Sequence, residues 1–301
     1  MPTVICLGAI IFDTILRVPA VVAAPAKVLA SECVQLGAGM ASSAAAAIAR
    51  LGGRAELWGR VGDDMAGRQT LADLAAAGVD VGRVRVCPGG RTPVSTILVD
   101  AAGQRLVVPF YDPALDRNSS WLPVERVAAA DVVLADPRWP EGSARLLEAA
   151  RAAGKPAVLD GDVAPLPVLE RLLPLASHPV LSEPALASLV GEIGVEPGLR
   201  ALAARLDGPV GVTAGERGFF WWEAGHINHV PAPGIAVVDT LSAGDVFHGA
   251  FALALAEGQA IADAGRFACV AASLKCRRFG GRLGAPGRDE VDAFLASGNN
   301  V

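Results

Sequence analysis

The sequence predicts an α/β protein: a doubly wound, mostly parallel sheet flanked by helices. From residue 131 onward, short apolar runs alternate with segments long enough for helices, which is typical of repeated βα units. Hydrophobic residues make up 52% of the 301 positions and charged residues 19%, so the chain can bury a large core and is not expected to be disordered. We therefore expect a single domain over residues 1–301.

The first apolar run, residues 4–12, predicts a buried strand that Gly8 interrupts and that ends at Asp13. Ligands of open α/β sheets lie at the carboxyl ends of the strands, so Asp13 is a candidate ligand contact, although a turn or cap residue would look the same. Residues 14–34 contain Pro19 and Pro25 and predict short strands or loops outside the main sheet. Residues 92–110 have a hairpin pattern, with a turn at Gly103.

The segment Gly37-Ala38-Gly39-Met40-Ala41-Ser42-Ser43 is close to the Gly-x-Gly-x-x-Gly/Ala pattern of dinucleotide sites. Glu56 lies at the distance where such a site places its ribose carboxylate. Two features oppose a nicotinamide oxidoreductase. No clean buried strand precedes the glycines, and Glu56 opens its strand rather than ending it, so its side chain cannot reach a ribose. The alanine-rich residues 41–51 instead predict a tightly packed helix.

Polar residues follow each later strand of the predicted sheet. Because the carboxyl ends of parallel strands meet at one edge, we expect these residues to gather where a ligand binds. A helix is expected over residues 143–153, and another near residue 186. The polar residues are Asp136 and Arg138 after strand 132–134, Asp160 and Asp162 after 157–159, Ser182 and Glu183 after 180–181, and Thr213 after 210–212.

The segment Asp239-Thr240-Leu241-Ser242-Ala243-Gly244-Asp245 lies between apolar runs at 235–238 and 246–255, which predict a strand and a helix. Small residues and the free N–H groups of a helix N-terminus make an anion site, most often for phosphate. Asp245 is then either an N-terminal cap or a general base that deprotonates a hydroxyl beside a phosphoryl group. Mechanism alone leaves both interpretations open.

Two other enzyme motifs are absent. A nucleophile elbow needs glycine two positions before the serine, but Thr240 stands there before Ser242. A Walker loop needs a Gly-Lys-Ser/Thr run, and the chain has none.

The net charge of −5 gives no basic field for nucleic acid or an anionic membrane. The start lacks a positive n-region, and no apolar stretch reaches transmembrane length, so a cytoplasmic protein is expected. Five cysteines without metal-type spacing fit reduced thiols. His226 and His229 lie beside a proline-rich turn and predict a surface location rather than a ligand pair.

The run from Asp239 to Asp245 resembles the C-terminal signature of the ribokinase-like (PfkB) sugar kinases, with Ser242 in place of the usual glycine. Residues 50–67 and 78–80 match the N-terminal signature, so the resemblance covers nearly the whole chain. It implies a ribokinase-like fold with a small β lid, formed by about 14–36 and 92–112. It also implies ATP-dependent phosphorylation of a sugar hydroxyl, with Asp245 as the base and the amides of Ser242, Ala243 and Gly244 as the anion hole.

The resemblance assigns binding residues as well. On the sugar side these are Asp13, Gly37, Ala38, Gly39 and Ser43, the last where the family usually has asparagine. On the ATP side they are Ser182, Thr213, Gly215 and Gly218, together with Lys275 and Gly280 in a segment that closes over adenine. The family's usual Asn-x-x-Glu motif for Mg²⁺ is absent, because Ala185 occupies the glutamate position; Glu183 is the substitute that the sequence offers.

Within the family, several stretches look closest to the bacterial 6-deoxy-6-sulfofructose kinases, among them 159–162 and 245–250. Those enzymes hold the sulfonate with a lysine, an asparagine and an arginine. Lys27 and Arg138 match by position, whereas Pro109 stands at the asparagine position and has no side-chain donor. We therefore expect a ketose or a sugar acid as substrate. For Lys27, a solvated lid residue is the alternative.

Two further expectations concern the whole protein. Because an exposed lid sheet often pairs in this family, the resemblance implies a homodimer through the lid. The alternative to catalysis is a binding or regulatory protein of the same fold that has lost turnover, which the changes at Ser43 and Ala185 would support.

Overall fold

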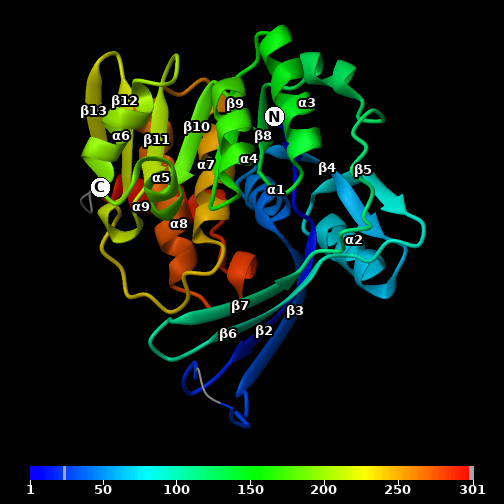
Figure 1. The fold of residues 1–301 in the computed structure, drawn as a ribbon. Coiled ribbons are helices and arrows are strands. Elements are labelled where there is room, and N and C mark those ends of the chain that lie inside the picture. The colour runs from blue at the N-terminus through cyan, green and yellow to red at the C-terminus, as the bar shows by residue number, and fades with distance from the viewer. Residues whose placement is uncertain (23–24, 298–301) are drawn as a thin grey trace.

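The computed structural model describes residues 1–22 and 25–297 and contains two sheets (Figure 1). Neighbouring strands of the main sheet pair in parallel from β11 to β5, and β12 and β13 extend it in antiparallel fashion. This arrangement confirms the predicted mostly parallel sheet. Its strand order is β13 (His226–Val230), β12 (Phe219–Glu223), β11 (Val210–Thr213), β10 (His178–Ser182), β9 (Ala157–Gly161), β8 (Val132–Ala135), β1 (Thr3–Leu7), β4 (Arg54–Gly62) and β5 (Asp80–Cys87).

Helices cover both faces of the main sheet. Alternate residues of β1 point to opposite sides: Val4 and Cys6 join one core cluster, and Ile5 and Leu7 join the other. The first cluster packs under α1 (Met40–Arg50), α2 (Met65–Ala76), α7 (Ala243–Ala256), α8 (Ile261–Cys276) and α9 (Arg288–Ala296). The second packs under α3 (Pro140–Ala152), α4 (Leu166–Leu172), α5 (Glu183–Val190) and α6 (Val195–Ala203).

Four short 3₁₀ turns complete the described helices: η1 (Val124–Ala129), η2 (Leu173–Leu175), η3 (Gly215–Arg217) and η4 (Gly281–Gly284). The helix predicted over 143–153 begins earlier, at Pro140, because proline is favoured in the first helical turn. Within residues 1–22 and 25–297, no helix has the length and apolar character needed to span a membrane.

Helices α1 and α7 pack closely against each other, as the alanine-rich sequence of α1 predicts. A Cβ atom on Gly249 of α7 would lie 2.5 Å from the carbonyl oxygen of Ala44 in α1, so only glycine permits this approach. The N-terminus of α7 is thereby held at the edge of the main sheet where the parallel strands end (Figure 1).

The second sheet has four strands in the order β3 (Glu32–Ala38), β2 (Ile11–Arg17), β6 (Val94–Val99) and β7 (Arg105–Phe110). Strands β6 and β7 form the predicted hairpin. This sheet lies across the edge of the main body (Figure 1), and we call it the lid.

The prediction of one strand over residues 4–12 is wrong. β1 ends at Leu7 in the main sheet, and β2 starts at Ile11 in the lid. Gly8 lies between them with φ +152°, and a Cβ atom there would lie 2.1 Å from Oδ2 of Asp136. Only glycine allows the chain to leave the main sheet here, so Asp13 reaches the ligand edge from the lid.

The prediction of a strand at 235–238 is also wrong. The N–H groups of Val238 and Asp239 donate to the carbonyl oxygen of Cys276, at 2.8 and 3.1 Å, at the end of α8. Val237 is 57% exposed, so the apolar residues here border a pocket and do not enter a sheet.

Candidate active site

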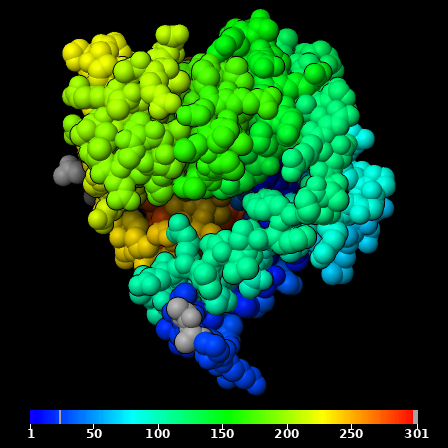
Figure 2. All heavy atoms as spheres, in the orientation of Figure 1, coloured from blue at the N-terminus to red at the C-terminus, as the bar shows by residue number. Residues whose placement is uncertain are grey.

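A hollow separates the lid from the main body (Figure 2), and two adjoining pockets lie within it. The inner pocket, of about 370 Å³, is lined by lid residues such as Asp13 and by Asp245. The outer pocket, of about 640 Å³, is lined by Gly215 and Gly218 among others. Thr240, Ala243 and Gly244 line both pockets, so the N-terminus of α7 lies between them.

The turn before α7 exposes backbone donors to both pockets. Ser242 precedes the helix in the left-handed region, with φ 60° and ψ 13°. The N–H of Ala243 is 3.2 Å from the carbonyl oxygen of Thr240, whereas within the described residues the N–H groups of Ser242 and Gly244 have no backbone acceptor. Free N–H groups and the positive end of the helix dipole favour an anion between the two pockets.

Asp245 lies in the first turn of α7 and lines the inner pocket. Burial and the neighbouring Asp160 carboxylate raise the pKa of Asp245 well above its ordinary value, and the side chain of Ser242 opposes this rise. A carboxylate with a raised pKa is better suited to accept a proton from a hydroxyl than an ordinary aspartate. The structure thus gives Asp245 the environment of a base, whereas its place in the first turn also suits a cap.

His248, one turn further along α7, was not singled out from the sequence. Its Nδ1 is 2.8 Å from the carbonyl oxygen of Gly244, and its Nε2 is 3.1 Å from that of Val180. Two carbonyl acceptors are both satisfied only when both ring nitrogens carry protons. Burial lowers the pKa of His248, whereas these two bonds raise it, and Oδ2 of Asp160 lies 3.4 Å from Nδ1 as a counter-charge.

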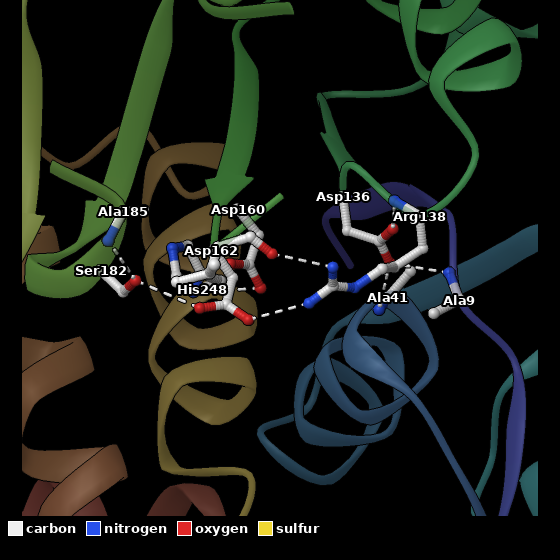
Figure 3. Close-up of polar contacts among 10 residues, drawn as sticks. Ala9, Ala41, Asp136, Arg138, Asp160, Asp162, Ser182, Ala185 and His248 are labelled. Atoms are coloured by element: carbon white, nitrogen blue, oxygen red, sulfur yellow. Dashed lines mark hydrogen bonds and ion pairs between the residues drawn. The ribbon is translucent and has the colours of Figure 1, made fainter. Parts of the chain in front are cut away.

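Arg138 connects the ends of two strands beside the inner pocket (Figure 3). Its Nη2 is 3.1 Å from Oδ2 of Asp162, and its Nη1 donates to the carbonyl oxygen of Val163 at 2.9 Å. The hydroxyl of Ser182 donates to Oδ1 of Asp162 at 3.1 Å. The predicted gathering of polar residues at this edge is therefore present, with Arg138 already paired.

At the same edge, the side chain of Asp136 holds three backbone segments together. It is fully buried and accepts N–H groups from Ala9 at 2.7 Å, Ala41 at 3.0 Å and Arg138 at 2.8 Å (Figure 3). These bonds join the loop after β1, the first turn of α1 and the loop after β8. Because Asp136 is fully buried and lines neither pocket, we assign it no ligand contact.

Asp13 faces the inner pocket from the lid. Only 7% of its surface is exposed, and the hydroxyl of Ser95 on the neighbouring strand donates to Oδ1 at 2.6 Å. Burial raises the pKa of Asp13 to about 6. A buried carboxylate with one protein donor retains lone pairs for ligand hydroxyls.

The outer pocket joins a polar end to an apolar slot. Thr213, Gly215 and Gly218, at the end of β11 and in the following turn, line the polar end, as predicted for a nucleotide segment. Residues of α7 and α8 also line this pocket: Phe247, Cys269, Ala272, Ser273 and Cys276. Such a pocket suits a flat aromatic base attached to a polar chain.

Lys275 and Gly280, predicted to contact a nucleotide, do not line either pocket. Lys275 is fully buried, donates to the carbonyl oxygen of Asp239 at 2.7 Å and lies 3.3 Å from its Oδ2. The N–H of Gly280 also donates to this Oδ2, at 3.0 Å. Both residues therefore position the segment before α7, and their contact with a nucleotide stays a prediction.

Several predicted sugar contacts also lie outside the pocket linings. Gly39 lines the inner pocket, but Gly37 and Ala38 do not; the N–H of Gly37 donates to Asp73 at 2.8 Å. Ser43 is fully buried in α1. Lys27 is exposed on the lid and lines neither pocket, as the alternative for this residue predicts.

Glu183 does not take the position of a metal ligand. It lines neither pocket, and its Oε1 is 2.6 Å from Nη2 of Arg217. In the described part of the chain, no three His, Cys, Asp or Glu side chains form a group that could hold a metal ion by themselves. The carboxylates that do line the inner pocket are Asp13, Asp160, Asp162 and Asp245.

The arginine and tyrosine contributed by the lid were missed as well. Arg105 of β7 lines both pockets and donates to the hydroxyl of Thr240, and Tyr111 lines the inner pocket. No sequence pattern marks Arg105, because its contact with Thr240 joins segments more than a hundred residues apart.

Comparisons with known proteins agree with this geometry. A family model described as pfkB family carbohydrate kinase matches residues 1–288. The ribokinase of Bacillus subtilis is 29% identical over 264 residues, which cover 86% of this chain and 87% of that protein. The fructokinase of Klebsiella pneumoniae is 31% identical over 235 residues, covering 71% of this chain and 75% of that protein.

Two solved structures are also similar to this chain in fold and sequence. A protein from Agrobacterium tumefaciens that carries a provisional ribokinase name is 47% identical, with a TM-score of 0.96 over 98% of both chains. The ribokinase of Arabidopsis thaliana, described as complexed with ribose and ATP, is 25% identical, with a TM-score of 0.84 over 98% of both chains.

Proposed function

The chain belongs to the pfkB family of carbohydrate kinases, and on that premise we propose that it transfers a phosphoryl group from ATP to a sugar hydroxyl with Asp245 as the base. One observation carries the proposal: the N-terminus of α7 lies between two pockets, with free amides in the turn before it and a carboxylate in its first turn. Phosphoryl transfer needs a donor and an acceptor on opposite sides of such an anion site.

We assign ATP to the outer pocket and the sugar to the inner pocket. The slot formed by Phe247 and α8 suits adenine, and Thr213 to Gly218 lead from it towards the α7 N-terminus. The Arabidopsis relative, whose structure is described with ribose and ATP, supports a pair of ligands in this fold. Asp13 and Gly39 face the inner pocket, where sugar hydroxyls can donate to the Asp13 carboxylate.

In the proposed reaction, Asp245 takes the proton from a sugar hydroxyl, which we expect to be a terminal CH₂OH. The amides of Ser242 and Gly244 face the charge that develops on the phosphoryl group, and Ala243 has the weaker role because its N–H already faces Thr240. Positioning and electrostatic stabilisation account for most of the rate in phosphoryl transfer. The lid covers the sugar and excludes water from this step.

Mg²⁺ fits this site only together with ATP. The ion usually takes one or two protein carboxylates, with phosphate oxygens and water as its other ligands. Asp162 suits this role because it lines the inner pocket and its side chain is 41% exposed, so Mg²⁺ would share this carboxylate with Arg138 and Ser182; Glu183 lines neither pocket. Bound there, Mg²⁺ would neutralise phosphate charge.

The finer proposal is a ketose or sugar acid as the substrate, as in the sulfofructose kinases that the sequence resembles. Arg138 lines the inner pocket and supports an anionic substrate, although its pairing with Asp162 must then be shared. Lys27 lies away from the pocket, and Pro109 lines it without a side-chain donor. Specificity for an anionic substrate therefore needs donors other than Lys27 and a side chain at position 109.

Two alternatives lose support. The regulatory alternative depended on Ser43 and Ala185, but Ser43 is buried away from both pockets. A nicotinamide site needs Glu56 free at the ligand edge. Glu56 lies near the start of β4, is 2% exposed and pairs with Arg126 at 2.7 Å.

The test is ATP turnover, measured as ADP release, with sulfofructose, fructose, fructose phosphates and 2-keto-3-deoxygluconate. We expect one sugar to be phosphorylated and the Asp245→Asn variant to lose at least about 100-fold in kcat while it still binds ATP. Asp207→Asn, at an exposed loop position, is the matched control and should keep wild-type kcat. Near-normal turnover in Asp245→Asn would exclude Asp245 as the base.

A further inference from the structure

A third cavity, of about 500 Å³, adjoins the inner pocket on the side away from α7. We call it the distal cavity. Tyr111 and Arg138 line both spaces, so the two are contiguous. Its other charged residues are Arg60, Arg117, Asp112 and Glu141, and Trp139 forms part of its wall.

Arg60 is a cation in this wall that no carboxylate contacts directly. Its guanidinium lies 4.0 Å from the ring centre of Trp139, and one nitrogen, Nη1, donates to the carbonyl oxygen of Asp116. Among the described residues, no carboxylate lies within 4.0 Å of it. Burial lowers the pKa of Arg60 to about 10, and the more distant carboxylates of Glu141, Asp116 and Asp136 offset this effect only in part.

The three arginines that line the distal cavity, Arg60, Arg117 and Arg138, outnumber its two carboxylates, Asp112 and Glu141. Both oxygens of Asp112 accept backbone N–H groups, from Arg91 at 2.8 Å and Ala114 at 3.0 Å. Arg117 is exposed and has no ion pair within the described chain, and Glu141 is the remaining carboxylate. Donors of Arg60 and Arg117 are therefore available to a ligand, whereas Arg138 is paired with Asp162.

We propose that the distal cavity is a subsite for an anionic group on the substrate, at the end remote from the hydroxyl that is phosphorylated. Arg60 and Arg117 would hold a carboxylate, sulfonate or phosphate, because a guanidinium presents several N–H donors to such oxygens. Tyr111 lies at the junction of the two spaces, where its phenol can donate to the same anion. This inference rests on the proposed sugar kinase function and identifies its substrate class.

The test compares sugars that differ only at the distal carbon: fructose, fructose 6-phosphate and 6-deoxy-6-sulfofructose. We expect the wild type to prefer a charged sugar. In Arg60→Gln and Arg117→Gln, the ratio of kcat/KM for charged to neutral sugar should fall about 10- to 100-fold, mainly through KM, since each variant loses a charged hydrogen bond. Arg171→Gln, at an exposed position in α4, removes the same charge elsewhere and should keep the ratio.

Other results of these measurements would overturn or support the anion subsite separately from the kinase activity. A wild type that prefers fructose, or a ratio unchanged in both variants, overturns the subsite while leaving the kinase in place. If no sugar is phosphorylated, thermal shift with sulfate against chloride at equal ionic strength decides the question. A sulfate-induced shift that is smaller in Arg60→Gln and Arg117→Gln supports the subsite, and equal shifts in all proteins overturn it. Arg117 is exposed, so its variant remains informative if Arg60→Gln fails to fold.

Discussion

Ser242 combines a backbone cost with an electrostatic effect on its neighbour. Its φ of 60° lies in the left-handed region, where a residue with a Cβ atom loses about 1 kcal/mol relative to glycine. Its side chain also lowers the pKa of Asp245, against the larger effect of burial. The serine at this position therefore reduces stability but keeps more of the proposed base in its carboxylate form.

Two substitutions at Ser242 separate these effects. Ser242→Gly should raise the free energy of unfolding by about 1 kcal/mol, and Ser242→Ala should not, because alanine keeps the Cβ atom. Both remove the hydroxyl, so both should raise the pKa of Asp245. Activity that depends on the carboxylate is lost as pH falls through this pKa, so the acidic limb of kcat should move to higher pH in both variants.

Urea denaturation and pH–rate profiles measure the two quantities independently. An acidic limb that stays in place in both variants would show that Ser242 does not act on the base. An equal stability change in the glycine and alanine variants would show that the left-handed backbone carries no strain.

At this scale, motifs with local spacing were predictable from the sequence. The run from Thr213 to Gly218 and the run from Ser242 to Asp245 both line the pockets. His248 was missed because its importance depends on the carbonyl of Val180, which packing brings near from 68 positions away. The resemblance placed Lys275 at a nucleotide, and the sequence contains no sign that this lysine would be fully buried.

At the scale of elements, the segment before α7 is held by a buried ion pair. Asp239 is 1% exposed; its Oδ2 accepts N–H groups from Gly280 and Gly281, both at 3.0 Å, and its Oδ1 accepts the N–H of Leu241 at 2.8 Å. Lys275 of α8 supplies the positive charge. These bonds connect the end of α8, the turn at 280–281 and the proposed anion site, so they position the first turn of α7.

Replacing Lys275 tests this role. Lys275→Met leaves the Asp239 carboxylate buried without its cation, which should lower the free energy of unfolding by about 3 kcal/mol or more. The matched control is Lys27→Met, an identical change at an exposed lid position, which should lie within about 0.5 kcal/mol of wild type. Urea denaturation measures both variants.

The same pair of variants tests the nucleotide contact predicted for Lys275. If the lysine only positions the anion site, the folded Lys275→Met variant should lose kcat more than ATP affinity. A variant that keeps wild-type stability and loses ATP binding would restore the predicted contact.

Two element boundaries could not be predicted, because they depend on contacts between residues that are distant in the sequence. The alternating strands and helices after residue 131 were predictable, because each is a local apolar run. The strand predicted at 235–238 has the same local pattern, but it packs on Cys276 and borders a pocket. The turn at Gly8 depends on the carboxylate of Asp136, which is distant in the sequence. Apolar character alone cannot separate these cases.

At the scale of the whole molecule, the lid has two faces with different surroundings. Successive residues of a strand point to opposite faces of a sheet. In β7, Val107 and Pro109 line the inner pocket, so the residues between them face away from it. Those outward residues are apolar and accessible: Leu106 is 42% exposed, Val108 59% and Phe110 40%. An apolar patch on an edge strand is typical of a surface that pairs with another chain.

This patch gives the proposed homodimer a test. A second copy would cover the outward face of β7, and a carboxylate placed there would have to be buried without a partner. We therefore expect Val108→Glu to convert a dimer into a monomer, with a dissociation constant at least about 10-fold weaker. Sedimentation velocity over a range of protein concentrations measures this change.

The control for the dimer is Ile193→Glu, which introduces the same charge at an apolar position that is 50% exposed and lies away from the lid. It should keep the wild-type dissociation constant. A wild type that stays monomeric at every concentration, or a Val108→Glu variant that dimerises as well as Ile193→Glu, would rule out pairing through the lid. Because β7 also contributes Arg105 and Val107 to the pockets, a true lid dimer should in addition raise KM for the sugar when Val108→Glu separates the copies. A higher KM in the separated copies would show that β7 couples dimerisation to sugar binding in the inner pocket.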